Sequence, residues 1–180
     1  AFMESKVSKL KINSVTVNAQ TVMSCFKDAY YIKDVSSLDI DWSKVNNATD
    51  FITNATSLQL PLLDTSASKI LTRIGCYGSS QYFMSGFKGL RVSNQAPFNN
   101  ATPPQINVSY TGMDRSALVT LFNDLPTVSA GQIINITGCT GASNLTGADM
   151  DIAINKGWTI TGSRDYVIDN GVLTWANPNI

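Results

Sequence analysis

The sequence predicts an α/β solenoid in which short parallel strands alternate with helical turns, followed by a β-hairpin. Three observations lead to this prediction. Short segments of alternating apolar and polar residues recur along most of the chain. Two clear helix patterns separate the later segments, and a hairpin pattern follows them. Each strand pattern covers about three positions, which is shorter than the strands that βαβ crossovers usually join.

The apolar segments recur at similar intervals. Their first apolar residues are Leu10, Leu38, Leu58, Leu90, Ile106, Ile134 and Trp158. The steps between them are 28, 20, 32, 16, 28 and 24 residues, and repeats of about 20–29 residues with one short strand each are typical of leucine-rich solenoids. We therefore expect a leucine-rich repeat solenoid over residues 1–162.

Helical turns are expected between the first strands. Within residues 16–35, Val22, Cys25 and Phe26 recur at helical spacing. The apolar positions of the next segment are Val45, Phe51 and Ile52.

The best-formed repeat spans residues 106–161. In its first helix, Asp114 can cap the N-terminus, an apolar stripe follows, and Pro126 stops the helix. The stripe consists of Leu118, Leu121, Phe122 and Leu125. The regularity of this region predicts two helices that need neighbouring repeats to cover them.

The second helix is predicted from its ends. Thr146 and Asp149 form a variant of the capping box, and Gly157 can end the helix in the left-handed conformation. After it, residues 163–180 read as a hairpin with Asn170-Gly171 in its turn. We expect this hairpin to be a cap on the solenoid or the start of a following module.

Composition excludes several functions. The 180 residues include 13 basic and 13 acidic side chains, with no Lys/Arg run, which argues against a nucleic-acid surface. No apolar stretch approaches the roughly twenty residues of a membrane span, so no membrane insertion is expected. The chain contains no histidine, which removes Ser-His-Asp and Cys-His catalysis and the commonest metal ligand.

Other chemical motifs are weak. The carboxylate pairs Asp39/Asp41 and Asp149/Asp151 are the remaining alternatives for a glycosidase-like or calcium site. The three cysteines have no metal-ligand spacing and are interpreted as buried apolar residues. Six N-x-S/T sequons are interpreted mostly as chance matches; they begin at Asn47, Asn54, Asn100, Asn107, Asn135 and Asn144. We therefore expect a protein that is not an enzyme and has no cofactor or metal.

Part of the chain resembles a known family. The features are helical turns ending at Phe26 and Phe51, the phrase DWSKV at residues 41–45, and the Leu-x-Leu strand that follows. These, with residues 106–161, resemble the BspA-type leucine-rich repeats of bacterial surface proteins and of phage virion or tail proteins. The resemblance covers residues 10–161. It implies a binding scaffold displayed outside the cell or on a virion, and it supplies no catalytic motif.

Strand alternation predicts the candidate binding residues. If the apolar residues point inward, their neighbours form a polar row on the exposed sheet face: Lys11, Asp39, Gln59, Arg91, Asn107, Asn135 and Thr159. Several aromatic residues are not explained by the core pattern, above all Tyr77, Tyr82 and Trp42, with Tyr30, Tyr31, Phe83 and Tyr110 as further members. A solvated sheet face is the alternative interpretation of the row.

These features predict a recognition or adhesion module that binds a host-surface protein or glycan. Its expected location is extracellular, on a bacterial surface or a phage virion. The alternative is a structural virion component, a fibre or decoration protein, whose exposed faces mediate self-association or contacts with other virion proteins.

Overall fold

The computed structural model describes residues 16–17, 19–35, 39–129, 131–162, 166–169 and 172–175. The fold is mixed α/β, with one large parallel sheet and two α-helices. This agrees with the predicted α/β class.

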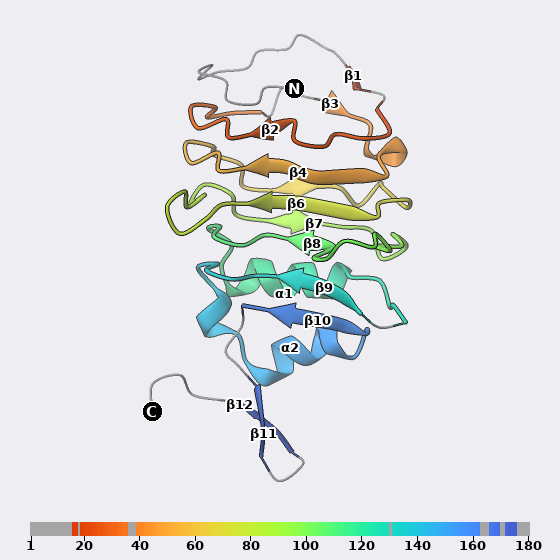
Figure 1. Ribbon diagram of the computed structural model, residues 1–180, viewed down its shortest axis with the longest axis vertical. Helices are drawn as coiled ribbons and strands as arrows, with labels where there is room; N and C mark the ends of the chain where they lie inside the picture. The colour runs from red at the N-terminus through yellow and green to blue at the C-terminus, as the bar shows by residue number, and fades with distance from the viewer. Residues whose placement is uncertain are drawn as a thin grey trace.

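The large sheet, called here the main sheet, has six parallel strands in the order β10-β9-β8-β6-β4-β2 (Figure 1). Its strands are β2 (Phe26–Lys27), β4 (Asn47–Thr53), β6 (Arg73–Tyr77), β8 (Ile106–Asn107), β9 (Gln132–Asn135) and β10 (Trp158–Thr161). Sequence order and spatial order therefore coincide across the whole sheet. The sequence separation of paired residues in neighbouring strands ranges from 24 to 32 positions. The shortest is between Ile52 and Cys76, and the longest is between Ile74 and Ile106.

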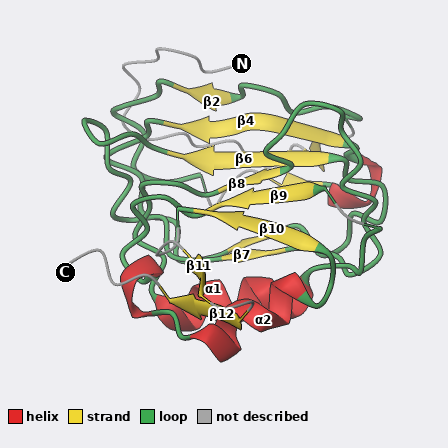
Figure 2. Ribbon diagram, turned by 60° about the horizontal axis from the view of Figure 1, so that its bottom comes forward, coloured by secondary structure: helices red, strands yellow, loops and turns green. Residues whose placement is uncertain are grey.

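Before β2, and between successive strands of the main sheet, the chain forms one further strand or α-helix each time, and these are called the intervening elements. They are β1 (Thr16–Val17), β3 (Asp39–Ile40), β5 (Leu63–Asp64), β7 (Leu90–Arg91), α1 (Arg115–Asp124) and α2 (Gly147–Ile154). β1 pairs with β3 and β5 with β7, both in parallel. The helices lie together at the C-terminal end of the main sheet (Figure 2). Two short 3-10 turns also occur, η1 (Trp42–Lys44) and η2 (Ala142–Asn144).

One continuous core lies between the main sheet and the intervening elements. Phe26, Ile52 and Cys76 are paired across neighbouring strands, and each is at most 1% exposed. The same core includes buried residues of the intervening elements, among them Leu90, Leu118, Phe122 and Met150. Burial of each large apolar side chain stabilises the fold by about 1.5–3 kcal/mol relative to exposure. The register of the main sheet thus places the buried side chains of neighbouring strands next to one another in the core.

A bulge interrupts β4. Between Ala48 and Ile52 the strand contains two more residues than β6 does over the same stretch. Asp50, within the bulge, has a φ of 51°, and its backbone nitrogen lies close to the α-carbon of Gly75. A Cβ on Gly75 would lie 2.9 Å from that nitrogen, so only glycine fits beneath the bulge.

Both predicted helices and their caps are confirmed. The Asp114 carboxylate accepts a hydrogen bond from a backbone N–H in the first turn of α1 (2.9 Å). Thr146 and Asp149 form the complete capping box of α2, and Gly157 follows the helix with a φ of 88°. These ends were predictable because capping depends on residues close together in the sequence.

The helical turns predicted in the first half are wrong. Residues 19–35 contain no helix; Phe26 instead begins β2 and pairs with Ile52. Ser24 and Asp28, with φ values of 50° and 55°, stand on either side of β2 and are incompatible with a continuous right-handed helix. The second turn is reduced to η1, and Phe51 belongs to β4.

Two strand assignments also change. Leu58–Leu60 makes only an isolated bridge, between Leu60 and Phe87. The strand of the main sheet at this point is β6, a stretch that is absent from the predicted strands. Leu90 does begin a strand, β7, but this strand pairs with β5 and lies outside the main sheet.

The hairpin is confirmed as β11 (Tyr166–Asp169) paired antiparallel with β12 (Val172–Trp175). Its Asn170-Gly171 turn lies outside the described residues, as does the first predicted strand, residues 10–12.

Four of the six sequons have a structural role. The side-chain oxygens of Asn47, Asn107 and Asn135 each accept two hydrogen bonds from the residue two positions later, one from its backbone N–H and one from its hydroxyl, at 2.7–3.1 Å. Asn100 accepts the backbone bond alone (2.9 Å). Asn and Ser/Thr at this spacing therefore form local side-chain turns, which explains the recurrence of the pattern better than chance.

Candidate functional site

The predicted polar row is only partly brought together. Asn107 and Asn135 are direct neighbours in the main sheet. Thr159 is displaced, because Thr161 is the residue that pairs with Asn135. Arg91 lies in the β5–β7 sheet.

The other members of the row are scattered. Asp39 lies in the β1–β3 sheet, and Gln59 is exposed in the segment before β5. Lys11 lies outside the described residues. A single row across one sheet face is therefore wrong, because alternation along each strand does not determine which strands share a sheet.

Trp42 is a core residue. It is 9% exposed, and its ring meets the edge of Phe51 at a centroid distance of 5.4 Å and an angle of 89°. Phe51 in turn packs edge-on against Phe26. The interpretation of Trp42 as a surface aromatic is therefore wrong.

Tyr82 pairs with Tyr30, a residue 52 positions earlier. The ring centroids lie 5.1 Å apart at an angle of 42°. Tyr30 follows β2 and Tyr82 lies in the loop after β6. Because parallel strands end on the same side of a sheet, the main sheet brings these two loops together at the edge toward which β4 and β6 point (Figure 1).

Two polar residues complete this arrangement. The Asp28 carboxylate accepts hydrogen bonds from Asn54 Nδ2 (2.7 Å) and from the Tyr30 hydroxyl (3.2 Å), both at Oδ1. Asp28 and Asn54 have nearly equal positive φ angles, 55° and 54°, directly after β2 and β4. Asn and Asp adopt this backbone conformation more readily than other side chains. We call Asp28, Tyr30, Asn54 and Tyr82 the tyrosine edge.

Tyr77 lies next to the tyrosine edge. Its hydroxyl donates a hydrogen bond to Asp50 Oδ1 (2.9 Å), above the bulge of β4. Burial and this bond to a carboxylate raise the pKa of Tyr77 to about 12. The pKa of Tyr30 is also raised, first by desolvation and then by Asp28 and Tyr82. Both phenols therefore stay protonated, as hydrogen-bond donors, far above neutral pH.

The sequence predicted Tyr77 and Tyr82 as candidate residues but not Asp28, Asn54 or Asp50. The sequence does contain a pattern from which Asp28 and Asn54 could have been predicted. Asp28 and Asn54 are 26 residues apart, which is also the offset between Phe26 and Ile52 in the sheet. Two turn-forming residues separated by the same offset as two paired strands are expected to lie in neighbouring turns at the ends of those strands.

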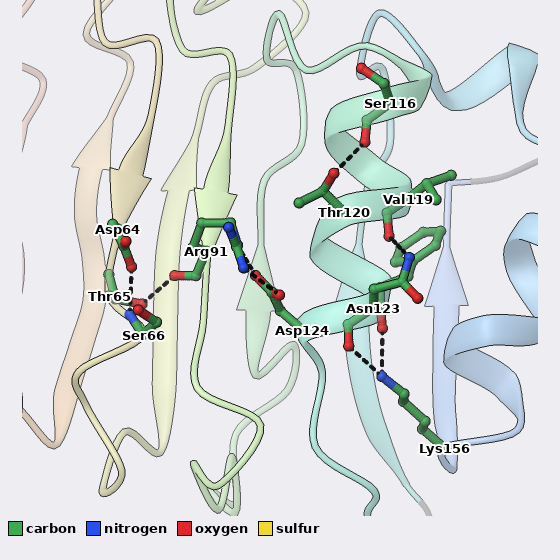
Figure 3. A network of polar contacts seen from close by, with 11 residues as sticks. Asp64, Thr65, Ser66, Arg91, Ser116, Val119, Thr120, Asn123, Asp124 and Lys156 are labelled. Atoms are coloured by element: carbon green, nitrogen blue, oxygen red, sulfur yellow. Dashed lines mark hydrogen bonds and ion pairs between the residues drawn. The ribbon is translucent and has the colours of Figure 1, made fainter.

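Arg91 takes part in a second polar cluster (Figure 3). Its guanidinium binds Asp124, at the end of α1, through Nε and through Nη2 (2.9 Å from Oδ1). Its carbonyl accepts hydrogen bonds from the Thr65 backbone N–H (2.9 Å) and hydroxyl (2.8 Å). A cavity of about 220 Å³ adjoins this pair, lined mainly by polar residues that include Ser66 and Asn94. Both hydrogen bonds of the Arg91 guanidinium go to Asp124 of the same chain. Arg91 therefore connects β7 with α1, and its guanidinium is not available to bind a ligand.

One member of each carboxylate pair has a structural role. Asp41 accepts a hydrogen bond from the Ser43 backbone N–H (3.2 Å) and pairs with Lys44 (3.1 Å). Asp149 caps α2 and binds Arg115. Within the part of the chain that the structure describes, no group of three or more His, Cys, Asp or Glu side chains is placed to hold a metal ion.

Two of the three cysteines are buried, as predicted. Cys76 and Cys139 are buried, Cys25 is half-buried, and all three are free thiols. Burial raises the pKa of each thiol, so these side chains are poor nucleophiles near neutral pH. Among the described helices, none is long and apolar enough to span a membrane.

Comparison with known proteins gives no match: no family model, no curated protein and no solved structure is similar to this chain. The resemblance to BspA-type repeats therefore rests on the sequence features alone, and function has to be argued from the tyrosine edge.

Proposed function

We propose that this chain is a non-enzymatic recognition module, built as a leucine-rich repeat solenoid of the BspA type. It acts outside the cell, on a bacterial surface or a phage virion, and binds a host-surface protein or glycan. The proposal assigns binding to the tyrosine edge.

The strand order supports the repeat architecture. Each strand of the main sheet pairs with the next one along the chain, and one intervening element separates them. Paired positions recur at 24–32 residues, as Ile52 with Cys76 and Ile74 with Ile106 illustrate. This is the arrangement expected when similar units stack and each contacts only its neighbours.

The observation that carries the binding role is the Tyr30–Tyr82 pair beside Asp28 and Asn54. Tyrosine combines a large apolar face with a polar end and few rotatable bonds, which suits it to recognition surfaces. Tyr31, next to Tyr30, is 53% exposed, and Phe83, next to Tyr82, is 39% exposed. Exposed aromatics beside oriented polar groups are typical of a binding surface and unusual on a purely solvated edge.

Binding of the fluorescently labelled chain to whole bacterial cells tests the proposal. We expect saturable binding that Tyr82→Ala weakens about tenfold, as for a binding hot spot. Ile70→Ala is the matched control, because Ile70 is 46% exposed and lies away from the tyrosine edge in sequence. Equal binding by all three proteins would contradict the proposal.

A structural virion role is the second candidate. Its support is the edge of the main sheet at β10, which pairs only with β9 among the described strands. An unpaired edge is a template for another chain. Light scattering after size-exclusion chromatography tests this alternative: a discrete oligomer that dissociates when proline replaces Thr159 favours assembly, and a monomer argues against it.

A further inference from the structure

We infer that the ligand of the tyrosine edge is a neutral glycan, with one sugar ring lying on the Tyr30–Tyr82 pair and its hydroxyls bound by Asp28 and Asn54. This inference rests on the proposed function and narrows it from surface molecules in general to one chemical class.

The first argument is the set of open acceptors. Asp28 uses only Oδ1 for its two hydrogen bonds, and Oδ2 accepts none from the described residues. Asn54 donates through Nδ2, while its Oδ1 has no partner within the same residues. Planar side chains with fixed orientation and unfilled acceptor positions match the many O–H donors of a sugar.

The second argument is that these acceptors are already oriented. The bond from Asn54 to Asp28 joins two successive turns of the chain, and the Tyr30 hydroxyl binds the same carboxylate oxygen. Tyr30 itself is held against Tyr82. A site that is ordered before binding loses less conformational entropy when the ligand arrives.

The third argument is the aromatic surface. A sugar ring has a face of C–H groups, which packs on the negative face of an aromatic ring and removes both from water. Tyr30 and Tyr82 are half-exposed, and the residues that follow them in the sequence, Tyr31 and Phe83, are exposed aromatics. A peptide could use the same rings, so the aromatics alone do not select the class.

Charge selects the neutral class. The Asp28 carboxylate belongs to the tyrosine edge, and the Asp50 carboxylate accepts a hydrogen bond from the neighbouring Tyr77 hydroxyl (2.9 Å). Lys27 directly precedes Asp28, and the whole chain has a net charge of +0. The Asp28 carboxylate repels an acidic ligand, and a chain with a net charge of +0 has no overall negative field to attract a strongly basic one.

The test uses the full chain on a printed array of neutral oligosaccharides, with titration of any sugar that binds. We expect Tyr82→Ala and Asp28→Asn to weaken binding about tenfold or more, and Tyr82→Phe to keep it within about twofold because the ring remains. Asp28→Asn keeps the shape of the side chain but turns one acceptor into a donor. Ile70→Ala and Asp64→Asn are controls for an exposed apolar residue and an exposed carboxylate elsewhere. Circular dichroism of each variant checks the fold.

Three results would overturn the inference. One is the absence of sugar binding while Tyr82→Ala still abolishes binding to cells, which indicates a protein ligand and leaves the proposed function intact. Another is stronger binding to charged oligosaccharides, printed beside the neutral ones, that falls steeply with added salt, which indicates a charged ligand. The last is sugar binding that Tyr82→Ala and Asp28→Asn leave unchanged, which places it away from the tyrosine edge.

Discussion

The ring of Tyr110 lies directly over the α-carbon of Gly138. A Cβ at Gly138 would come within 2.5 Å of Tyr110 Cδ1, and Gly138 has a φ of 67°. Tyr110 donates its backbone N–H to the carbonyl of Thr137, so the two turns are also joined by a main-chain bond (2.7 Å).

Gly138→Ala should therefore lower the free energy of unfolding by about 2–4 kcal/mol, because strain at positive φ and a steric clash add together. The matched control is Gly131→Ala: Gly131 has a φ of 91°, but a Cβ there would meet nothing within 4 Å. Its cost should be about 1–2 kcal/mol, from the backbone alone. Urea unfolding measures both values. Equal losses would mean that the Tyr110 ring moves away at no cost.

The ion pair between α1 and α2 should make stability depend on acid. Arg115 lowers the pKa of Asp149 to about 2, with further help from Thr146. Because this folded value lies below the unfolded value of 3.8, the ionised carboxylate stabilises the fold above pH 4. That contribution is lost as the pH falls from about 4 to about 2.

Asp149→Asn should remove about 1–2 kcal/mol of stability at neutral pH, allowing for the half-exposed Arg115, and flatten the acid dependence below pH 4. Thermal unfolding between pH 2 and pH 6 measures this. Asp151→Asn, an exposed carboxylate on the same helix, should leave the curve unchanged. An unaltered acid limb in Asp149→Asn would count against the ion pair as its source.

Tyr77 should titrate with a pKa of about 12. Its folded pKa lies above the usual 10, so its contribution to stability is present below pH 10 and is lost as the pH rises toward 12. Ultraviolet difference titration follows the ionisation of tyrosine side chains. In Tyr77→Phe, the ionisation phase near pH 12 should be absent. Asp50→Asn should shift that phase to lower pH by removing a negative charge, whereas the distant Asp151→Asn should not.

Asn107→Ala should lower the free energy of unfolding by about 1–2 kcal/mol, because it removes two hydrogen bonds and leaves the buried Ser109 hydroxyl without its acceptor. Asn144→Ala is the control, since Asn144 also begins a sequon but is exposed and its side chain makes no hydrogen bond with the described residues. Its effect should stay within about 0.5 kcal/mol. Chemical denaturation distinguishes the two, and equal effects would argue against a structural role for the sequon pattern.

The second half of the fold was predictable because its signals are local. The caps at Asp114 and Thr146, and the left-handed Gly157, depend on residues within one or two turns of helix. The first half was not. β2 is only two residues long, and its hydrogen bonds go to a strand 26 positions later, so nothing in its own sequence separates it from a helix.

The candidate site was half predicted for a similar reason. Tyr77 and Tyr82 stood out because the core pattern did not explain them. Trp42 stood out in the same way, yet it belongs to the core, since the bulge of β4 turns Phe51 inward to meet it. The contribution of Asp28 depends on pairing between distant turns, which alternation along one strand cannot reveal.

The change of intervening elements along the chain also sets its shape. β5 and β7 pair as strands, which lie about 4.8 Å apart, whereas the packed helices α1 and α2 require about 8–10 Å. The strands of the main sheet keep the shorter spacing throughout. The layer with the longer spacing fits the outside of a bend, so helices as intervening elements should favour a curved main sheet and strands a straight one. Added segments with helices would then extend the molecule as an arc, and added segments with strands would extend it as a rod.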